Sequence, residues 1–257
     1  MFTTYHLIWG ILSLFLICMG LFFLNKCKPK LKSVLSVACV ICVLSELIKT
    51  LSVIKIVPSS DGTMFFPYIE MQHMPLHLCS LQILIIFYVR FTKNDRMRQI
   101  LLSFMYPTCT LGAFFALLLP SIFTASLLPQ EAFINPLAYQ FFLYHTLLVI
   151  LGLYIPMSKQ VDIKPKNYFT TLMILGIISF VSLYINSALA SATYVNEELI
   201  SVDYVPNFFF TFLTPIDIPL TTIGHWYVYV GILLVLAILL IAVFYIPIFL
   251  KHRKNKN

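Results

Sequence analysis

Residues 224–250 read GHWYVYVGILLVLAILLIAVFYIPIFL and are followed at once by the basic sequence KHRKNK at 251–256. The run contains no Lys, Arg, Asp or Glu. It is longer than the ~20 apolar residues that a helix needs to cross ~30 Å of hydrocarbon. An apolar run with a basic cluster at one end predicts a membrane-spanning helix whose basic end is cytoplasmic.

Six more runs of this kind occur, and the whole composition agrees with them. The chain is 60% hydrophobic and 11% charged, whereas soluble domains are ~45–50% apolar and ~25% charged. Its 23 Phe and 14 Tyr exclude a disordered chain. Because lipid cannot satisfy open backbone groups, the spans must be helical. We predict an all-α integral membrane protein, one transmembrane domain over 1–257, with seven spans at 6–25, 33–57, 75–92, 99–120, 139–157, 168–193 and 224–250.

The charges predict the orientation of this bundle. Four clusters hold 15 of the 17 Lys and Arg: 26–32, 90–98, 159–166 and 251–256. Each cluster follows or separates apolar runs, which is typical of cytoplasmic loops rather than of a nucleic-acid-binding surface. The other three connections, 58–74, 121–138 and 194–223, contain no Lys or Arg. We therefore expect the N-terminus outside and the C-terminus in the cytoplasm.

Two of the external connections are unusually aromatic. The stretch 194–223 contains Phe208, Phe209 and Phe210, and Phe65-Phe66-Pro67-Tyr68 lies in the connection 58–74. Such residues are too apolar for freely solvated loops. We expect re-entrant or interfacial segments that lie over the outer end of the bundle.

Cys79 differs from the other five cysteines in its position. It lies in Met74-Pro75-Leu76-His77-Leu78-Cys79-Ser80-Leu81-Gln82, where Pro75 suits the first turn of a helix. A thiol near the positive end of the helix dipole is favoured as thiolate. The predicted depth of Cys79 is ~6 Å below the outer surface. Cys39 and Cys42 form a C-x-x-C in the second span, where cysteine behaves as a small hydrophobe.

His145 lies at a similar predicted depth, six residues or ~9 Å inside the fifth span. An ionisable residue within a span is a functional candidate by default, and the alternative is a structural hydrogen bond to a neighbouring helix. Asn186 in the sixth span, Gln82 on the helix face of Cys79, and His225 at the start of the seventh span complete a possible polar cluster. These three residues could equally join helices to one another.

Glu46 and Lys49 lie inside the second span, with Glu46 near the predicted midplane. Their i, i+3 spacing permits an ion pair on one face of the helix. Because isolated charges in lipid are costly, we expect pairing and an inward orientation. A structural pair and a role in proton transfer both remain open.

The string Pro75-Leu76-His77-Leu78-Cys79, His145 downstream, and the tail with Asn207-Phe208-Phe209 and Gly224-His225-Trp226 resemble a known family. The chain, over roughly 40–235, looks like the bacterial YwaF-like integral membrane proteins, which are related to the vertebrate acyltransferase called transmembrane protein 164. The resemblance implies acyl transfer between phospholipids, with Cys79 as the nucleophile and His145 as the base.

A thiolate activated by a neighbouring His is chemically suited to attack an ester. On this hypothesis the acyl chain passes through a Cys79 thioester to a lysophospholipid, or to water in a hydrolase. Asn186, Gln82 or His77 would support the reaction. We expect membrane phospholipid and lysophospholipid as partners, no nucleic acid and no cofactor, in the plasma membrane of a bacterium.

Two other classes of function remain open at this stage. A metal-dependent lipid hydrolase would need at least three ligands, from among His73, His77, His145, His225 and Asp217. A non-enzymatic seven-span transporter or receptor would use Glu46 and Lys49 instead. The sequence leaves the lipid donor, the acceptor and the oligomeric state open.

Overall fold

The computed structural model describes residues 3–59, 61–120, 122, 127–195, 198–203, 207–214, 220 and 222–254. Its principal helices are α1 (Thr4–Cys27), α2 (Leu31–Val53), α3 (Leu78–Phe91), α4 (Asp95–Leu118), α6 (Pro136–Met157), α7 (Lys166–Leu189) and α8 (Ile223–Lys254). Within the described ranges, six of these helices are long and apolar enough to cross a membrane, and α3 is a shorter apolar helix. A seven-span bundle agrees with this count.

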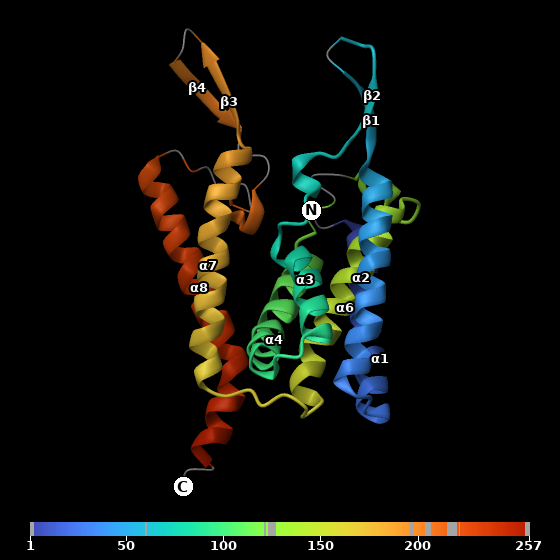
Figure 1. Cartoon of the computed structure of the whole chain (residues 1–257), viewed down its shortest axis with the longest axis vertical. Coiled ribbons are helices and arrows are strands. Elements are labelled where there is room, and N and C mark those ends of the chain that lie inside the picture. Colours follow the sequence, from blue (N-terminus) through green and yellow to red (C-terminus); the bar gives the residue numbers. More distant parts are fainter. Residues whose placement is uncertain are drawn as a thin grey trace.

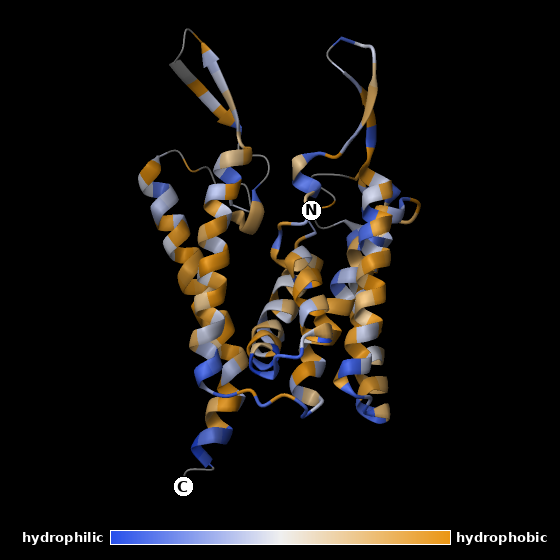
Figure 2. Cartoon of the chain, viewed as in Figure 1, coloured by the Kyte–Doolittle hydropathy of each residue, from blue (hydrophilic) through white to orange (hydrophobic). Residues whose placement is uncertain are grey.

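The helices lie side by side along one axis (Figure 1). Two short antiparallel hairpins project from one end: β1 (Lys55–Pro58) pairs with β2 (Phe65–Tyr68), and β3 (Ser191–Val195) pairs with β4 (Glu198–Asp203). We call this the hairpin end. The opposite end, where α1, α3, α6 and α8 finish, is the basic end, because the four basic clusters lie there. Figure 2 shows hydrophilic residues gathered at the basic end and apolar residues along the helices.

The core lies between α4 and α6, which each carry more buried residues than any other described helix. Their backbones approach closely at Gly152. A Cβ at that position would lie 2.3 Å from Thr110 Oγ1 and 2.9 Å from the Thr110 backbone nitrogen. No side chain fits there, so glycine sets the distance between the two central helices. In contrast, α7 and α8 stand beside this core and join it mainly through α4.

All seven predicted spans are present as helices, with ends within four residues of the predicted ones. The largest physical difference concerns α2, which ends at Val53 rather than at 57. The apolar run continues, but Ile56 and Val57 are β-branched and Pro58 cannot continue a helix, so this part forms strand β1. Glu46 therefore lies seven residues, ~10 Å, from the hairpin end of α2 and not near its middle.

The predicted start of the third span at Pro75 is wrong. The Leu76 N–H donates to the Met74 carbonyl at 2.8 Å, which places Pro75 at the centre of a tight γ-turn. Residues 71–73 form a short 3-10 helix, η1, and α3 begins only at Leu78. With 14 residues, α3 is ~21 Å long and is shorter than its neighbours.

The aromatic connections lie only partly over the bundle. Strands β1 to β3 carry mainly exposed side chains, and both hairpins project away from the helices, which corrects the prediction for Phe65–Tyr68. The part that packs against the bundle is residues 207–214, here called the aromatic loop. It contains the 3-10 helix η3 (Phe208–Phe210), and Phe208 is completely buried.

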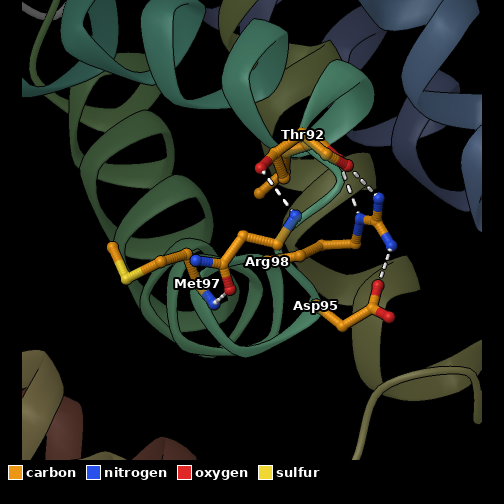
Figure 3. A network of polar contacts seen from close by, with 6 residues as sticks. Thr92, Asp95, Met97 and Arg98 are labelled. Atoms are coloured by element: carbon orange, nitrogen blue, oxygen red, sulfur yellow. Dashed lines mark hydrogen bonds and ion pairs between the residues drawn. The ribbon is translucent and has the colours of Figure 1, made fainter.

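At the basic end, Arg98 fixes the turn between α3 and α4 (Figure 3). Its guanidinium donates to the carbonyl oxygens of Val89 and Thr92 and forms an ion pair with Asp95. The last carbonyls of a helix have no partner within the helix, and a basic side chain can satisfy them. Arg98 thus attaches the end of α3 to the start of α4 and fixes the height of α3 in the bundle.

Candidate active site

Cys79 is the second residue of α3, and His77 precedes the helix with no side-chain hydrogen bond that caps it. Leu81 N–H donates to the His77 carbonyl at 2.9 Å. The N–H groups of residues 78–80 have no acceptor among the described residues. The first N–H groups of a helix carry partial positive charge and attract anions. The expected position of Cys79 at the positive end of a helix is therefore present.

The side chain of Cys79 points toward α4. Its Sγ lies 3.7 Å from the position that a Cβ on Gly112 would occupy. Cys79 as a residue is half-buried. Gly112 is six residues, ~9 Å, from the hairpin end of α4. The sulfur is thus level with a residue ~9 Å inside α4, although Cys79 is only the second residue of α3.

Helix α6 supplies two polar side chains near Cys79. The Tyr144 hydroxyl donates to the Cys79 carbonyl at 2.7 Å. His145 follows it, is 8% exposed, and lies nine residues, ~14 Å, from the start of α6. This is deeper than predicted, since α6 begins at Pro136, capped by Asn135. In the described part of the chain, no direct contact joins the Cys79 sulfur to His145.

The hydrogen bond of His145 fixes its tautomer. Nδ1 lies 2.6 Å from the Phe141 carbonyl oxygen, which can only accept, so Nδ1 carries the proton. The neutral ring then presents a lone pair at Nε2. In this tautomer Nε2 is the ring atom that can receive a proton.

Gln82 is fully buried one turn below Cys79. Its Nε2 donates to Thr108 Oγ1 at 2.9 Å, and that hydroxyl donates to the Phe104 carbonyl, which fixes the orientation of the amide. Gln82 Oε1 has no partner among the described residues. The free atom of Gln82 is therefore an acceptor, which suits a hydroxyl group but not the carbonyl oxygen of an ester.

Asn186 acts within the structure as an anchor for the aromatic loop. It exchanges two hydrogen bonds of 2.9 Å with the backbone of Phe208 and donates to Thr211 Oγ1 at 2.9 Å. It is fully buried, three residues before the end of α7. Both the amide nitrogen and the amide oxygen of Asn186 are used in these contacts. Asn186 therefore has the structural role that the sequence left open, and it joins α7 to the aromatic loop.

The aromatic loop connects Asn186 to the start of α3 through His77. The rings of His77 and Phe208 meet edge to face at 4.9 Å between centroids. Phe209 and Phe210 adopt left-handed backbone conformations, with φ of 59° and 53°, which non-glycine residues rarely adopt. His225 lies exposed in the first turn of α8, where its N–H donates to Thr222 Oγ1.

Glu46 and Lys49 form the predicted ion pair, with 2.6 Å between Glu46 Oε1 and Lys49 Nζ. Both residues lie on α2, which packs against α3 and α6, the helices that carry Cys79 and His145. Sequence reasoning missed Tyr144, although a tyrosine hydroxyl within an apolar span usually requires a partner.

Metal-ligand geometry is not found in the described ranges: no group of three or more His, Cys, Asp or Glu side chains could hold a metal ion there. His73 and His77 do not share a helix face, because His73 ends η1 and His77 lies beyond the γ-turn. Asp217 is outside the described residues.

The architecture is that of a multi-pass membrane protein with a half-buried cysteine at the start of a short helix. The chain matches the TMEM164 family over residues 1–246, and it belongs to that family. This confirms the relation that the motif around Cys79 predicted. The comparisons with curated proteins and with solved structures gave no match.

Proposed function

We propose that this protein is a membrane-embedded acyltransferase that moves a fatty acyl chain from a phospholipid to a lysophospholipid through a thioester on Cys79. The observation that carries the proposal is the position of Cys79 at the open N-terminus of α3, tied to α6 beside a histidine of defined tautomer. Membership of the TMEM164 family supports it.

In the first half-reaction, His145 Nε2 removes the thiol proton and the Cys79 sulfur attacks the ester carbonyl of the donor phospholipid. The oxyanion that forms lies near the free N–H groups of residues 78–80, which stabilise negative charge. The intermediate expels the alkoxide of the lysophospholipid, which takes the proton back from His145. The thioester and a lysophospholipid remain.

In the second half-reaction, an acceptor lysophospholipid brings a hydroxyl group to the thioester. His145 removes the hydroxyl proton, the oxygen attacks the thioester carbonyl, and the Cys79 thiolate leaves and is reprotonated. Gln82 Oε1, an unpartnered acceptor on the helix face of Cys79, is suited to orient this hydroxyl. Water in place of the acceptor would give hydrolysis.

The proposed orientation places the hairpin end outside the plasma membrane of a bacterium and the basic end in the cytoplasm. The ester bonds of a phospholipid lie just below its headgroup. The Cys79 sulfur, ~9 Å below the hairpin end of α4, is at a depth that these bonds can reach. The site therefore fits lipids of the leaflet at the hairpin end.

The test is intact-protein mass spectrometry after incubation with a phospholipid that carries one defined acyl chain. We expect an added acyl mass in the wild-type protein and none in Cys79→Ala. Cys109→Ala is the matched control, because Cys109 is a buried cysteine on α4, one turn from the Gly112 that faces Cys79, and has no place in the reaction. An acyl adduct that persists in Cys79→Ala would refute the nucleophile.

A further inference from the structure

Lys49 is an unusual cation in this chain. Fifteen of the 17 Lys and Arg lie in the four clusters of the basic end, and the two others are Lys49 and Lys55. Lys55 lies in the exposed strand β1, where it pairs with Glu70. Lys49 is thus the one Lys or Arg that lies within a membrane-spanning helix away from the basic end.

The position of Lys49 faces the protein interior. The buried stripe of α2 includes Leu35, Ala38, Cys42, Ser45 and Val53. Lys49 continues this stripe between Ser45 and Val53, at helical spacing. Its side chain is only 14% exposed. The stripe packs against α3 and α6, and Ser45 accepts a 2.8 Å hydrogen bond from Gln140 of α6.

The stability of the bundle gives no reason for a charge at this place. A buried ion pair is often no more stabilising than apolar residues of the same size. Glu46 is the one ion-pair partner of Lys49 among the described residues, so it leaves ammonium donors of Lys49 unused. Helix α2 packs against α3 and α6, and Lys49 lies on the stripe of α2 that is buried in this contact. The free donors therefore lie on the side of α2 that faces these two helices.

The depths of Lys49 and Cys79 follow the order of groups in a phospholipid. Lys49 is four residues, ~6 Å, from the hairpin end of α2, and the Cys79 sulfur is ~9 Å from the hairpin end of α4. In a phospholipid the phosphate lies nearer the membrane surface than the ester bonds. A lipid that enters from the hairpin end would place its phosphate near Lys49 when its ester is near Cys79.

We propose that Lys49, oriented by Glu46, binds the phosphate group of the lipid whose ester faces Cys79, so that the site selects phosphate-bearing lipids over neutral glycerolipids. This inference rests on the proposed function for the identity of the reacting ester. The binding itself needs no reaction, and it can be measured in a protein that lacks the nucleophile.

The binding experiment uses purified Cys79→Ala protein and native mass spectrometry. A phosphatidylethanolamine and a diacylglycerol with identical acyl chains are the two probes. We expect Lys49→Met to weaken phosphatidylethanolamine binding about tenfold or more, since hydrogen bonds to charged groups are among the strong ones. Diacylglycerol binding should not change. Lys49→Arg, which keeps the charge, should retain most of the preference.

The double variant Glu46→Gln/Lys49→Met avoids leaving an unpaired carboxylate in the bundle. It should behave like Lys49→Met. Equal weakening of both lipids, or no change in either, would overturn the proposal. The proposal would also be overturned if inorganic phosphate displaced both lipids completely while the two lipids bound equally well, because Lys49 would then bind a free anion rather than a lipid phosphate.

The same Lys49 variants, made in protein that keeps Cys79, separate this proposal from the proposed function. We expect Lys49→Met to raise the phosphatidylethanolamine concentration for half-maximal acylation about tenfold, with the diacylglycerol reaction unchanged. Phosphate-dependent binding without any acyl adduct in the wild-type protein would support the role of Lys49 and refute the acyltransferase. An acyl adduct that forms equally well in Lys49→Met and with both lipids would support the acyltransferase and refute the role of Lys49.

Discussion

The Tyr144 hydroxyl donates a 2.7 Å hydrogen bond to the backbone carbonyl of Cys79 and so attaches α6 to the first turn of α3. The bond holds the residue that follows Tyr144 in a fixed register relative to the cysteine. That residue is His145, whose Nδ1–H is committed to the Phe141 carbonyl. The proposed base is thus positioned by the hydrogen bond of its neighbour Tyr144 and by its own hydrogen bond to Phe141, and neither of these uses Nε2.

The first prediction concerns His145→Gln. Loss of the general base should slow thioester formation by about 10²–10⁴-fold. Raising the pH should restore part of the rate, because hydroxide then ionises the thiol directly and the thiolate is the nucleophile. The measurement is the rate of acyl-adduct formation against pH.

His6→Gln provides the control for His145→Gln. His6 is a second buried histidine near the hairpin end, and its Nε2 bonds the Leu117 carbonyl at 2.9 Å. This variant should lower stability but leave the rate per folded molecule unchanged. Equal rates in the His145→Gln and wild-type proteins would remove His145 from the mechanism.

The second prediction concerns the anchor of the aromatic loop. Asn186→Leu leaves the buried N–H of Phe208 without a partner, and its carbonyl keeps only the 3.3 Å hydrogen bond from Thr211 Oγ1. We expect a loss of about 2 kcal/mol or more in the free energy of unfolding, since each buried orphan group is costly. Thermal unfolding in detergent measures the stability, and limited proteolysis reports whether residues 207–214 detach. Ser187→Ala, on the exposed side of α7, should change neither result.

The third prediction concerns the contact between α4 and α6. Gly152→Ala places a methyl group against Thr110 Oγ1 and the Thr110 backbone, and a backbone atom cannot move without the helix. We expect a loss of about 1–3 kcal/mol, which is typical of overpacking. Thr110→Ala in the same chain should rescue only part of it. Gly176→Ala, where no atom lies within 4 Å, should be neutral or stabilising, and a similar loss there would contradict the argument.

The helices could be predicted because a long apolar run between basic clusters has few physical solutions in a membrane. Boundaries failed where hydropathy does not distinguish a helix from a strand, as in the Ile56-Val57-Pro58 part of β1. The prediction that the third span begins at Pro75 was wrong for a different reason. Proline suits both the first turn of a helix and a tight turn, and only the contacts around it decide between them.

The candidate site was predictable where the chemistry belongs to single side chains. Cys79 and His145 were selected for their chemistry and depth. The partners of Asn186 and the orphan oxygen of Gln82 depend on contacts between distant segments, which spacing along one helix cannot reveal. Because the Gln82 amide nitrogen donates to Thr108, only the amide oxygen is left for a ligand, and the sequence does not show which of the two atoms is free.

Helix α3 has a consequence for the membrane that surrounds the protein. Arg98 fixes its basic end, and a regular helix then holds Cys79 ~18 Å above that end, twelve residues along the axis from Phe91. Lipid esters have no such fixed height, because they follow the thickness of the bilayer. A thicker membrane would carry the esters away from the sulfur, and a thinner one would bring them toward it. Acyl-chain length in the host membrane would then affect the proposed reaction in two ways. The chains are the groups that are transferred, and their length sets the bilayer thickness and so the distance between the ester bonds and the thiol.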